Sequence, residues 1–170
     1  MRYTVRTILD VLGRIATFIE DALLVVLLTG LIGFATLQIF QRNILGSGFV
    51  WTDELLRMMV LAIALVGALA ASRDDNHINI DVFTRFLPPL PKIIVRIFVD
   101  AFTTGTCGIV AWHSMTFVNM EKEAASVILN GFPAWVFQSI IPLCFGLIAW
   151  RYLTYFTVHL YRLIKKEYTI

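Results

Sequence analysis

The stretch that decides the fold lies at residues 51–81 and reads WTDELLRMMVLAIALVGALAASRDDNHINID. Its centre is an apolar run of membrane-helix length, and charged residues crowd both of its ends. Charges this close to a lipid-embedded helix are costly unless something outside the hydrocarbon uses them. The stretch therefore predicts a transmembrane helix whose two ends make contacts beyond the bilayer core.

The composition of the whole chain points the same way. Hydrophobic residues make up 58% of the 170 residues and charged residues 15%, whereas soluble domains average about 45–50% and about 25%. Cys107 and Cys144 both lie in apolar runs, which argues against a disulfide framework or a zinc site. The net charge of +2 is too small to indicate nucleic acid as a partner. These values place the chain in a bilayer.

A spanning helix needs about 20 mainly apolar residues. Four segments meet this requirement, at residues 22–40, 51–72, 91–120 and 132–150. The first is interpreted as a retained helix rather than a signal peptide, because no convincing small-residue cleavage site follows it. In the fourth, Pro133 suits the first helical turn, and Pro142 predicts a kink near residues 138–142.

The basic residues set the orientation. Eleven of the 14 lysine and arginine residues fall at the N-terminus, between the second and third spans, in the first turns of the third span, or in the C-terminal tail, and three fall on the opposite side. The positive-inside rule then places both termini in the cytoplasm. We predict an all-α integral membrane protein with four transmembrane helices that forms a single membrane domain over residues 1–170.

The connection between the second and third spans has its own pattern. Apolar pairs at 82/83 and 86/87 alternate with polar residues before Pro88 stops any helix. This spacing predicts a short amphipathic helix at residues 79–87, lying along the cytoplasmic membrane surface. The alternative is an irregular loop whose apolar side chains dip into the interface.

Small residues recur at four-residue spacing in the second and third spans. They include Ala64, Gly67, Ala68, Ala71, Gly105 and Gly108. Such pairs let helix backbones approach closely, which drives helix association in lipid. Packing within the chain is the default interpretation, and packing against a partner subunit is the alternative.

Several charged residues lie at the N-terminal end of the second span, which is predicted to face the periplasm. Trp51 suits the membrane interface, Thr52 is a candidate helix cap, and Asp53 and Glu54 suit a helix N-terminus. These roles leave Arg57, one turn further in, without an explanation. The other interpretation pairs Arg57 with Asp53 or Glu54 and packs it against another subunit. Both interpretations remain open.

The remaining polar groups do not suggest chemistry. The predicted depths of His77, His113 and His159 exclude a bis-histidine haem site within one copy of the chain. Asp100 lies near the cytoplasmic end of the third span, and we interpret it as an interfacial carboxylate that is salt-bridged to Arg96. We find no nucleophile with a base and no metal-ligand spacing, so nothing indicates an enzyme. The sequence has no visible internal repeat and no mid-membrane carboxylate, so we do not expect the chain to move a substrate alone.

The order of residues along 51–88 adds a family resemblance. The matching residues are Trp51, Asp53, Glu54, Arg57, Gly67, Ala68, Arg73, His77, Ile78, Asp81, Leu87 and Pro88. Together they resemble the small membrane subunit of tripartite ATP-independent periplasmic (TRAP) transporters, the DctQ-like family. The four spans, the inside termini and the basic tail agree with that family.

The resemblance implies partners and a division of labour. A periplasmic binding protein would capture an organic acid, and a large membrane subunit would carry it inward by a sodium-coupled elevator motion in the bacterial inner membrane. The small subunit, without a cofactor of its own and embedded in membrane lipid, would form a heterodimer with the large one and support it. The sodium is then expected in the large subunit. The transported acid is not encoded here, and sialic acid and C4-dicarboxylates are both used by such systems.

The resemblance also yields hypotheses about individual residues. Asp53, Glu54 and Arg57, with Trp51, would hold the large subunit or form part of a periplasmic docking surface. The residues expected near a transiently docked binding protein are Phe49, Glu121, Lys122 and Glu123. The residues of the cytoplasmic-side structural motif are Arg73, His77 and Asp81. The rival classes are a membrane anchor of an electron-transfer complex, a small homo-oligomeric exporter and a structural assembly subunit.

Overall fold

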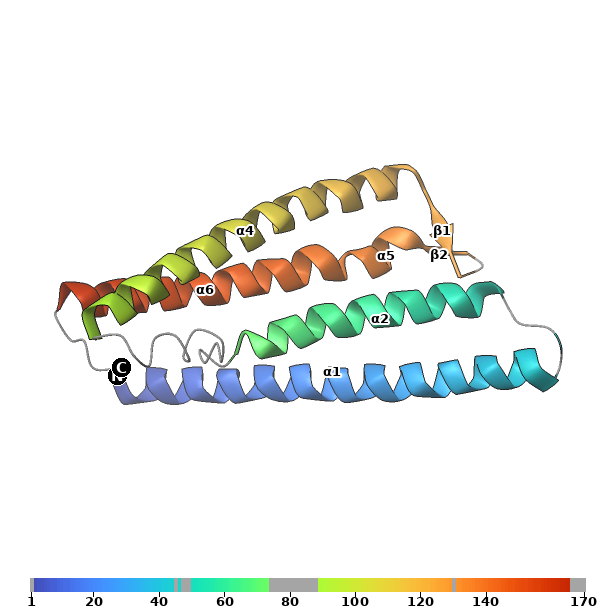
Figure 1. Ribbon diagram of the computed structural model, residues 1–170, viewed down its shortest axis with the longest axis horizontal. Helices are drawn as coiled ribbons and strands as arrows, with labels where there is room; N and C mark the ends of the chain where they lie inside the picture. The colour runs from blue at the N-terminus through green and yellow to red at the C-terminus, as the bar shows by residue number, and fades with distance from the viewer. Residues whose placement is uncertain (1, 45, 47–49, 74–88, 130, 166–170) are drawn as a thin grey trace. The chain divides into compact units, whose positions relative to one another are not determined.

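The computed structural model describes residues 2–44, 46, 50–73, 89–129 and 131–165 (Figure 1). The helices are α1 (Arg2–Ile44), α2 (Val50–Ala71), α4 (Pro89–Glu123), α5 (Ala134–Gln138) and α6 (Ile140–Ile164). Two short strands, β1 (Val127–Ile128) and β2 (Phe132–Pro133), precede α5. The described chain is therefore nearly all helical.

Four helical stretches are long and apolar enough to cross a membrane, as the sequence predicts. They are Gly13–Ile44, Trp51–Ala71, Pro91–Glu123 and Ala134–Ile164. Most exceed the predicted spans because the helices continue past their apolar windows. The predicted interfacial helix at 79–87 lies outside the described residues. The orientation of the termini stays a prediction.

The fourth span differs from its prediction at its start. Phe132 and Pro133 belong to β2, so the helix begins at Ala134 and Pro133 is not in its first turn. The helix is interrupted at Ser139, between α5 and α6, within the range where Pro142 predicts a kink. Pro142 has no backbone N–H to donate to the carbonyl group of Gln138, which accounts for an interruption at this point.

The hairpin between α4 and α5 was not predicted. Val127 pairs with Pro133 and Ile128 with Phe132 in antiparallel register. Gly131, with a φ of 128°, donates its N–H to the carbonyl oxygen of Ile128 at 3.2 Å. A positive φ of this kind is readily available only to glycine. Two-residue strands carry no alternating pattern from which they could be recognised.

The chain divides into two compact units. The first comprises residues 1–70 and 121–138, and the second comprises residues 71–120 and 139–170. Each unit has its own packing contacts. The prediction of one membrane domain for the whole chain stays a prediction.

In the first unit, α1 and α2 pack as an antiparallel pair (Figure 1). A Cβ added to Gly30 would lie 2.9 Å from the terminal methyl group of Met59, so the helices approach closely there. Further along the pair, Gln38 donates a hydrogen bond to Asp53. The small residue at this helix contact is therefore Gly30, which is not among the small residues predicted to pack.

In the second unit, α4 and α6 carry the buried side chains. They are Ile93, Asp100 and Val118 from α4, and Cys144, Ile148, Tyr152 and His159 from α6. Outside this core many large apolar side chains stay exposed, including Phe98, Phe102 and Trp150. Exposed apolar surface of this extent is what a hydrocarbon environment accommodates.

Candidate functional site

One face of α2 combines most of the residues that the sequence pattern singles out. The exposed residues of this helix recur every three or four positions: Asp53, Glu54, Arg57, Val60, Leu61, Ala64, Ala68 and Ala71. The most buried ones, Leu65, Val66 and Leu69, lie toward the other side. At about 100° per residue, the exposed set forms a single stripe along the helix.

Two carboxylates at the start of this stripe are used within the chain. Asp53 accepts a hydrogen bond from the Nε2 group of Gln38 on α1. The Oε2 atom of Glu54 accepts one from the backbone N–H of Leu129, at 3.1 Å. Thr52 lies inside the helix, not at its cap, and its hydroxyl is buried without a hydrogen-bond partner among the described residues. Trp51 is half-buried.

Arg57 is in a different position from the two acids. Its side chain is exposed, and it makes no hydrogen bond or ion pair with any residue that the structure describes. The carboxylates of Asp53 and Glu54 therefore have partners other than Arg57, namely Gln38 and the Leu129 amide. The stripe begins with two satisfied acids and one cation that has no partner in the described ranges.

The small residues of the stripe are open. Ala64, Ala68 and Ala71 are exposed. A Cβ added to Gly67, or to Gly105 or Gly108 of α4, would meet nothing within 4 Å. Packing within the chain and packing against a partner therefore both stay predictions for these glycines.

The loop after α4 is fastened to the start of α2. Beyond the Glu54 contact, Ala134 donates its N–H to the carbonyl oxygen of Ser126 at 2.9 Å. Lys122 lies 5.5 Å from the centre of the Trp135 ring, within cation–π range. Glu121 is half-buried and Glu123 exposed. The predicted docking residues Glu121, Lys122 and Glu123 thus end α4, directly before this loop, while Phe49 lies outside the described residues.

In the second unit, the two residues that follow α2 contact α6. The Tyr155 hydroxyl donates to the carbonyl oxygen of Arg73 at 2.8 Å, and Arg151 donates to the Ser72 hydroxyl at 3.1 Å. Arg73, which is one of the three residues of the predicted cytoplasmic-side motif, thus contacts Tyr155 through its backbone carbonyl group. His77 and Asp81 lie outside the described residues.

A buried pair joins α4 to α6 in the second unit. The Nδ1 atom of His159 lies 2.7 Å from Oδ2 of Asp100, and both side chains are almost fully buried. The sequence pattern paired Asp100 with Arg96 and did not connect it to His159. The two residues are 59 positions apart, and only the shared cytoplasmic depth predicted for both pointed to this contact.

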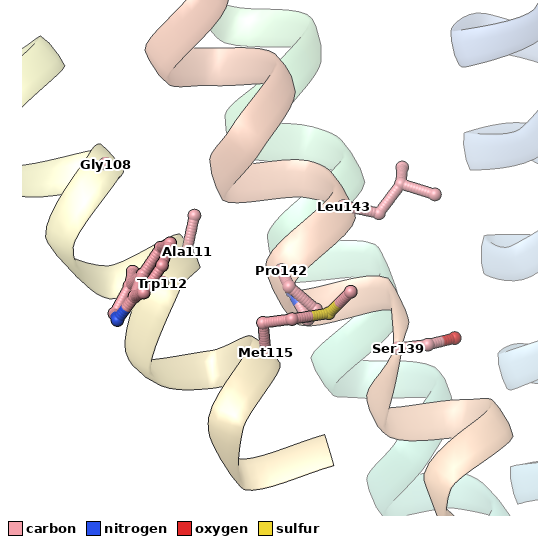
Figure 2. A pocket seen from close by; sticks show the side chains of 7 residues that line it. All are labelled: Gly108, Ala111, Trp112, Met115, Ser139, Pro142 and Leu143. Carbon is pink, nitrogen blue, oxygen red and sulfur yellow. The ribbon is translucent and has the colours of Figure 1, made fainter. Parts of the chain in front are cut away.

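An apolar cavity of about 510 Å³ lies between α4 and α6. Figure 2 shows Met115 of α4 extending toward Pro142 of α6. The lining residues are Gly108, Ala111, Trp112, Met115, Ser139, Pro142 and Leu143. None of them carries a charge, so the cavity suits hydrocarbon rather than a charged solute.

No group of three or more His, Cys, Asp and Glu side chains in the described ranges is placed to hold a metal ion. Cys107 and Cys144, both within those ranges, are not joined in a disulfide.

Comparison with known proteins identifies what this arrangement is similar to. A family model described as "Tripartite ATP-independent periplasmic transporters, DctQ component" matches residues 31–163. The sialic acid TRAP transporter small permease protein SiaQ of Vibrio cholerae is 34% identical over 85 residues, which cover 50% of this chain and 49% of that protein. The chain therefore spans about half the length of this relative.

Two longer alignments extend the comparison. The ectoine TRAP transporter small permease protein TeaB of Halomonas elongata is 24% identical over 147 residues, covering 84% of this chain and 76% of that protein. The isethionate TRAP transporter permease protein DctMQ of Oleidesulfovibrio alaskensis is 27% identical over 151 residues. That match covers 84% of this chain but only 24% of the relative.

Proposed function

The chain belongs to the DctQ family of tripartite ATP-independent periplasmic transporters, and we propose that it is the small subunit that supports a large, elevator-type permease without binding the substrate. It is a multi-pass membrane protein with four apolar helices. Because the family consists of transporter permease subunits, we assign no catalytic role to any residue.

The observation that carries the support role is how α2 uses its polar residues. Asp53 and Glu54 hydrogen-bond to this chain's own α1 and hairpin loop. These contacts hold the first turns of the helix. Beyond them, the helix presents an exposed face with Arg57 and small residues. A braced helix with an open face is suited to holding another protein.

The length of one relative supports the choice of partner. The region similar to this chain makes up about a quarter of the DctMQ permease. In that protein the remaining three quarters belong to the same polypeptide. We assign the corresponding role here to a separate large permease, with which this chain forms a heterodimer.

Substrate choice is assigned to the other subunits. The relatives are named for sialic acid, ectoine and isethionate, although each is only a distant match to this chain. The imported solute is proposed to be an organic acid of the sialic acid or C4-dicarboxylate class, delivered by a periplasmic binding protein. Sodium coupling, which the resemblance implies, is placed in the large permease.

The loop fastened by Glu54 is the proposed contact for the binding protein. Directly before it, at the end of α4, Lys122 and Glu123 are exposed charges. Charged rims of this kind steer encounter and select partners. Following the positive-inside rule, we assign this loop to the periplasmic side of the inner membrane and both termini to the cytoplasm.

Uptake measurements in a host that lacks its own TRAP systems test this function. The host would express a large TRAP permease and a binding protein from the organism of this chain, with or without this chain, and would receive radiolabelled sialic acid or C4-dicarboxylates. We expect uptake of one class that is lost when this chain is omitted. Full uptake without the chain, at equal membrane levels of the large permease, would contradict the proposal.

A further inference from the structure

We propose that the face of α2 from Arg57 to Ala71, called here the Arg57 face, binds one transmembrane helix of the large permease that carries a carboxylate at the depth of Arg57. This inference rests on the proposed function and specifies which surface makes the complex. The Arg57 face consists of Arg57, Val60, Leu61, Ala64, Ala68 and Ala71, all of which are exposed.

The geometry of the Arg57 face matches one helix. At about 100° per residue, Ala64, Ala68 and Ala71 lie within about 40° of the direction of Arg57. At about 1.5 Å per residue, the distance from Arg57 to Ala71 is about 21 Å, most of a bilayer core. The face is therefore a narrow track along the helix rather than a broad patch.

Its side chains favour helix packing over lipid packing. Lipid tails are as apolar as leucine, so helices associate in a bilayer through close van der Waals contact. Because Ala64, Ala68 and Ala71 have only methyl side chains, a neighbouring helix backbone can come close along the part of the Arg57 face from Ala64 to Ala71. Gly67, at its flank, has no atom within 4 Å of an added Cβ and would not obstruct that neighbour.

Arg57 determines the chemistry of the partner. It lies about two turns, or about 10 Å, inside the start of α2 at Val50. Asp53 and Glu54 are four and three residues away on the same face, but they accept hydrogen bonds from Gln38 and Leu129. An arginine within a membrane helix ordinarily pairs with an acidic group or reaches the interface. A carboxylate can take two parallel hydrogen bonds from its guanidinium group.

The same charge argues against a second copy of this chain as the occupant. In a two-fold dimer with its axis along the membrane normal, the two Arg57 side chains would face each other at equal depth. Juxtaposed like charges disfavour such a complex by several kcal/mol. The large permease is a different chain, so it can supply the opposite charge.

Site-specific photo-crosslinking tests the location. A photoreactive phenylalanine analogue would replace Ala64 or Ala68, and Val26, an exposed residue of α1, would be the matched control. With the large permease co-expressed, we expect an adduct of both polypeptides from Ala64 and Ala68 and none from Val26. Adducts only with lipid, with a second copy or within this chain would overturn the inference.

Matched substitutions test the chemistry. Arg57→Gln and Ala68→Leu are each expected to lower the amount of co-purified large permease by about tenfold, a change that corresponds to about 1.4 kcal/mol. Arg42→Gln and Val26→Leu alter exposed residues of α1 outside the face and should leave the yield unchanged. Fluorescence-detected gel filtration of each variant would establish equal amounts of folded chain.

The outcomes separate this inference from the proposed function. Wild-type chain that captures no large permease contradicts the proposed function and the inference with it. Capture by the wild type that persists undiminished in Arg57→Gln and Ala68→Leu contradicts the Arg57 face alone. Loss in those two variants with retention in both controls supports the face.

Discussion

The Nδ1 atom of His159 and the Oδ2 atom of Asp100 lie 2.7 Å apart, with both side chains almost fully buried between α4 and α6. A carboxylate without a partner in such a place is strongly disfavoured. The histidine satisfies it, and the pair joins two helices that are separated by the hairpin loop in the sequence. A polar contact thus fixes the register of α4 and α6.

Removing either member of this pair should destabilise the protein. We expect Asp100→Leu and His159→Leu each to lower the free energy of unfolding by about 1–3 kcal/mol, because each removes one side of a buried hydrogen bond. The double variant removes both polar groups and should lose less than the sum of the two. Thermal unfolding in detergent micelles measures all three, and strictly additive losses would show that the pair is not coupled.

Gly30 should be sensitive to size where Gly33 is not. A Cβ at Gly30 meets the methyl group of Met59 at 2.9 Å, whereas one at Gly33 meets nothing within 4 Å. Gly30→Leu should therefore lower the melting temperature relative to Gly33→Leu, which serves as its control on the same helix. Adding Met59→Ala to Gly30→Leu should restore part of the loss by making room. Equal effects of the two leucine substitutions would place the α1–α2 contact elsewhere.

The Glu54 carboxylate should protect the Leu129 amide. Leu129 has a φ of 51°, a left-handed conformation that a non-glycine residue adopts at a cost, and Glu54 accepts its N–H. In Glu54→Ala, amide hydrogen exchange at Leu129 should accelerate about tenfold, as expected for loss of about 1.4 kcal/mol of hydrogen bonding. Glu123→Ala removes a nearby exposed carboxylate and provides the comparison. Unchanged protection in Glu54→Ala would mean that the loop holds its shape without this contact.

The sequence predicted the features that depend on local composition, such as the apolar helices. It did not predict the hydrogen bonds between residues that are far apart in the chain. Four apolar runs were enough to locate four helices, and Pro142 was enough to locate the interruption near Ser139. The contact that fastens the hairpin loop joins residues 75 positions apart, and the Asp100 pair joins residues 59 apart. No local pattern encodes such contacts.

The candidate site shows the same division. Charge spacing alone identified Arg57, Asp53 and Glu54 as candidates. The hydrogen bonds of the folded chain then show that Asp53 and Glu54 have partners, whereas Arg57 has none among the described residues. Four-residue spacing selected Gly67 as a packing residue, although the close helix contact uses Gly30. Spacing shows where a helix could be approached, and it does not show which side a neighbour occupies.

The predicted orientation can be checked with reporter fusions. Because eleven of the 14 basic residues lie on one side, a fluorescent protein after Lys165 should fold and emit in the cytoplasm. Alkaline phosphatase inserted after Gly131, in the hairpin loop, should be active in the periplasm. The reverse pattern of activities would contradict the topology and move the proposed docking loop to the wrong side.

The central claim is that this chain is one half of a membrane heterodimer, and native mass spectrometry of the complex tests it most directly. The chain would be co-expressed with a large TRAP permease from the same organism and purified through an affinity tag on this chain. The complex would be released from its detergent micelle in the spectrometer. We predict one species whose mass equals one 19.3 kDa chain plus one large permease. A spectrum that contains only this chain, alone or as copies of itself, would contradict the account.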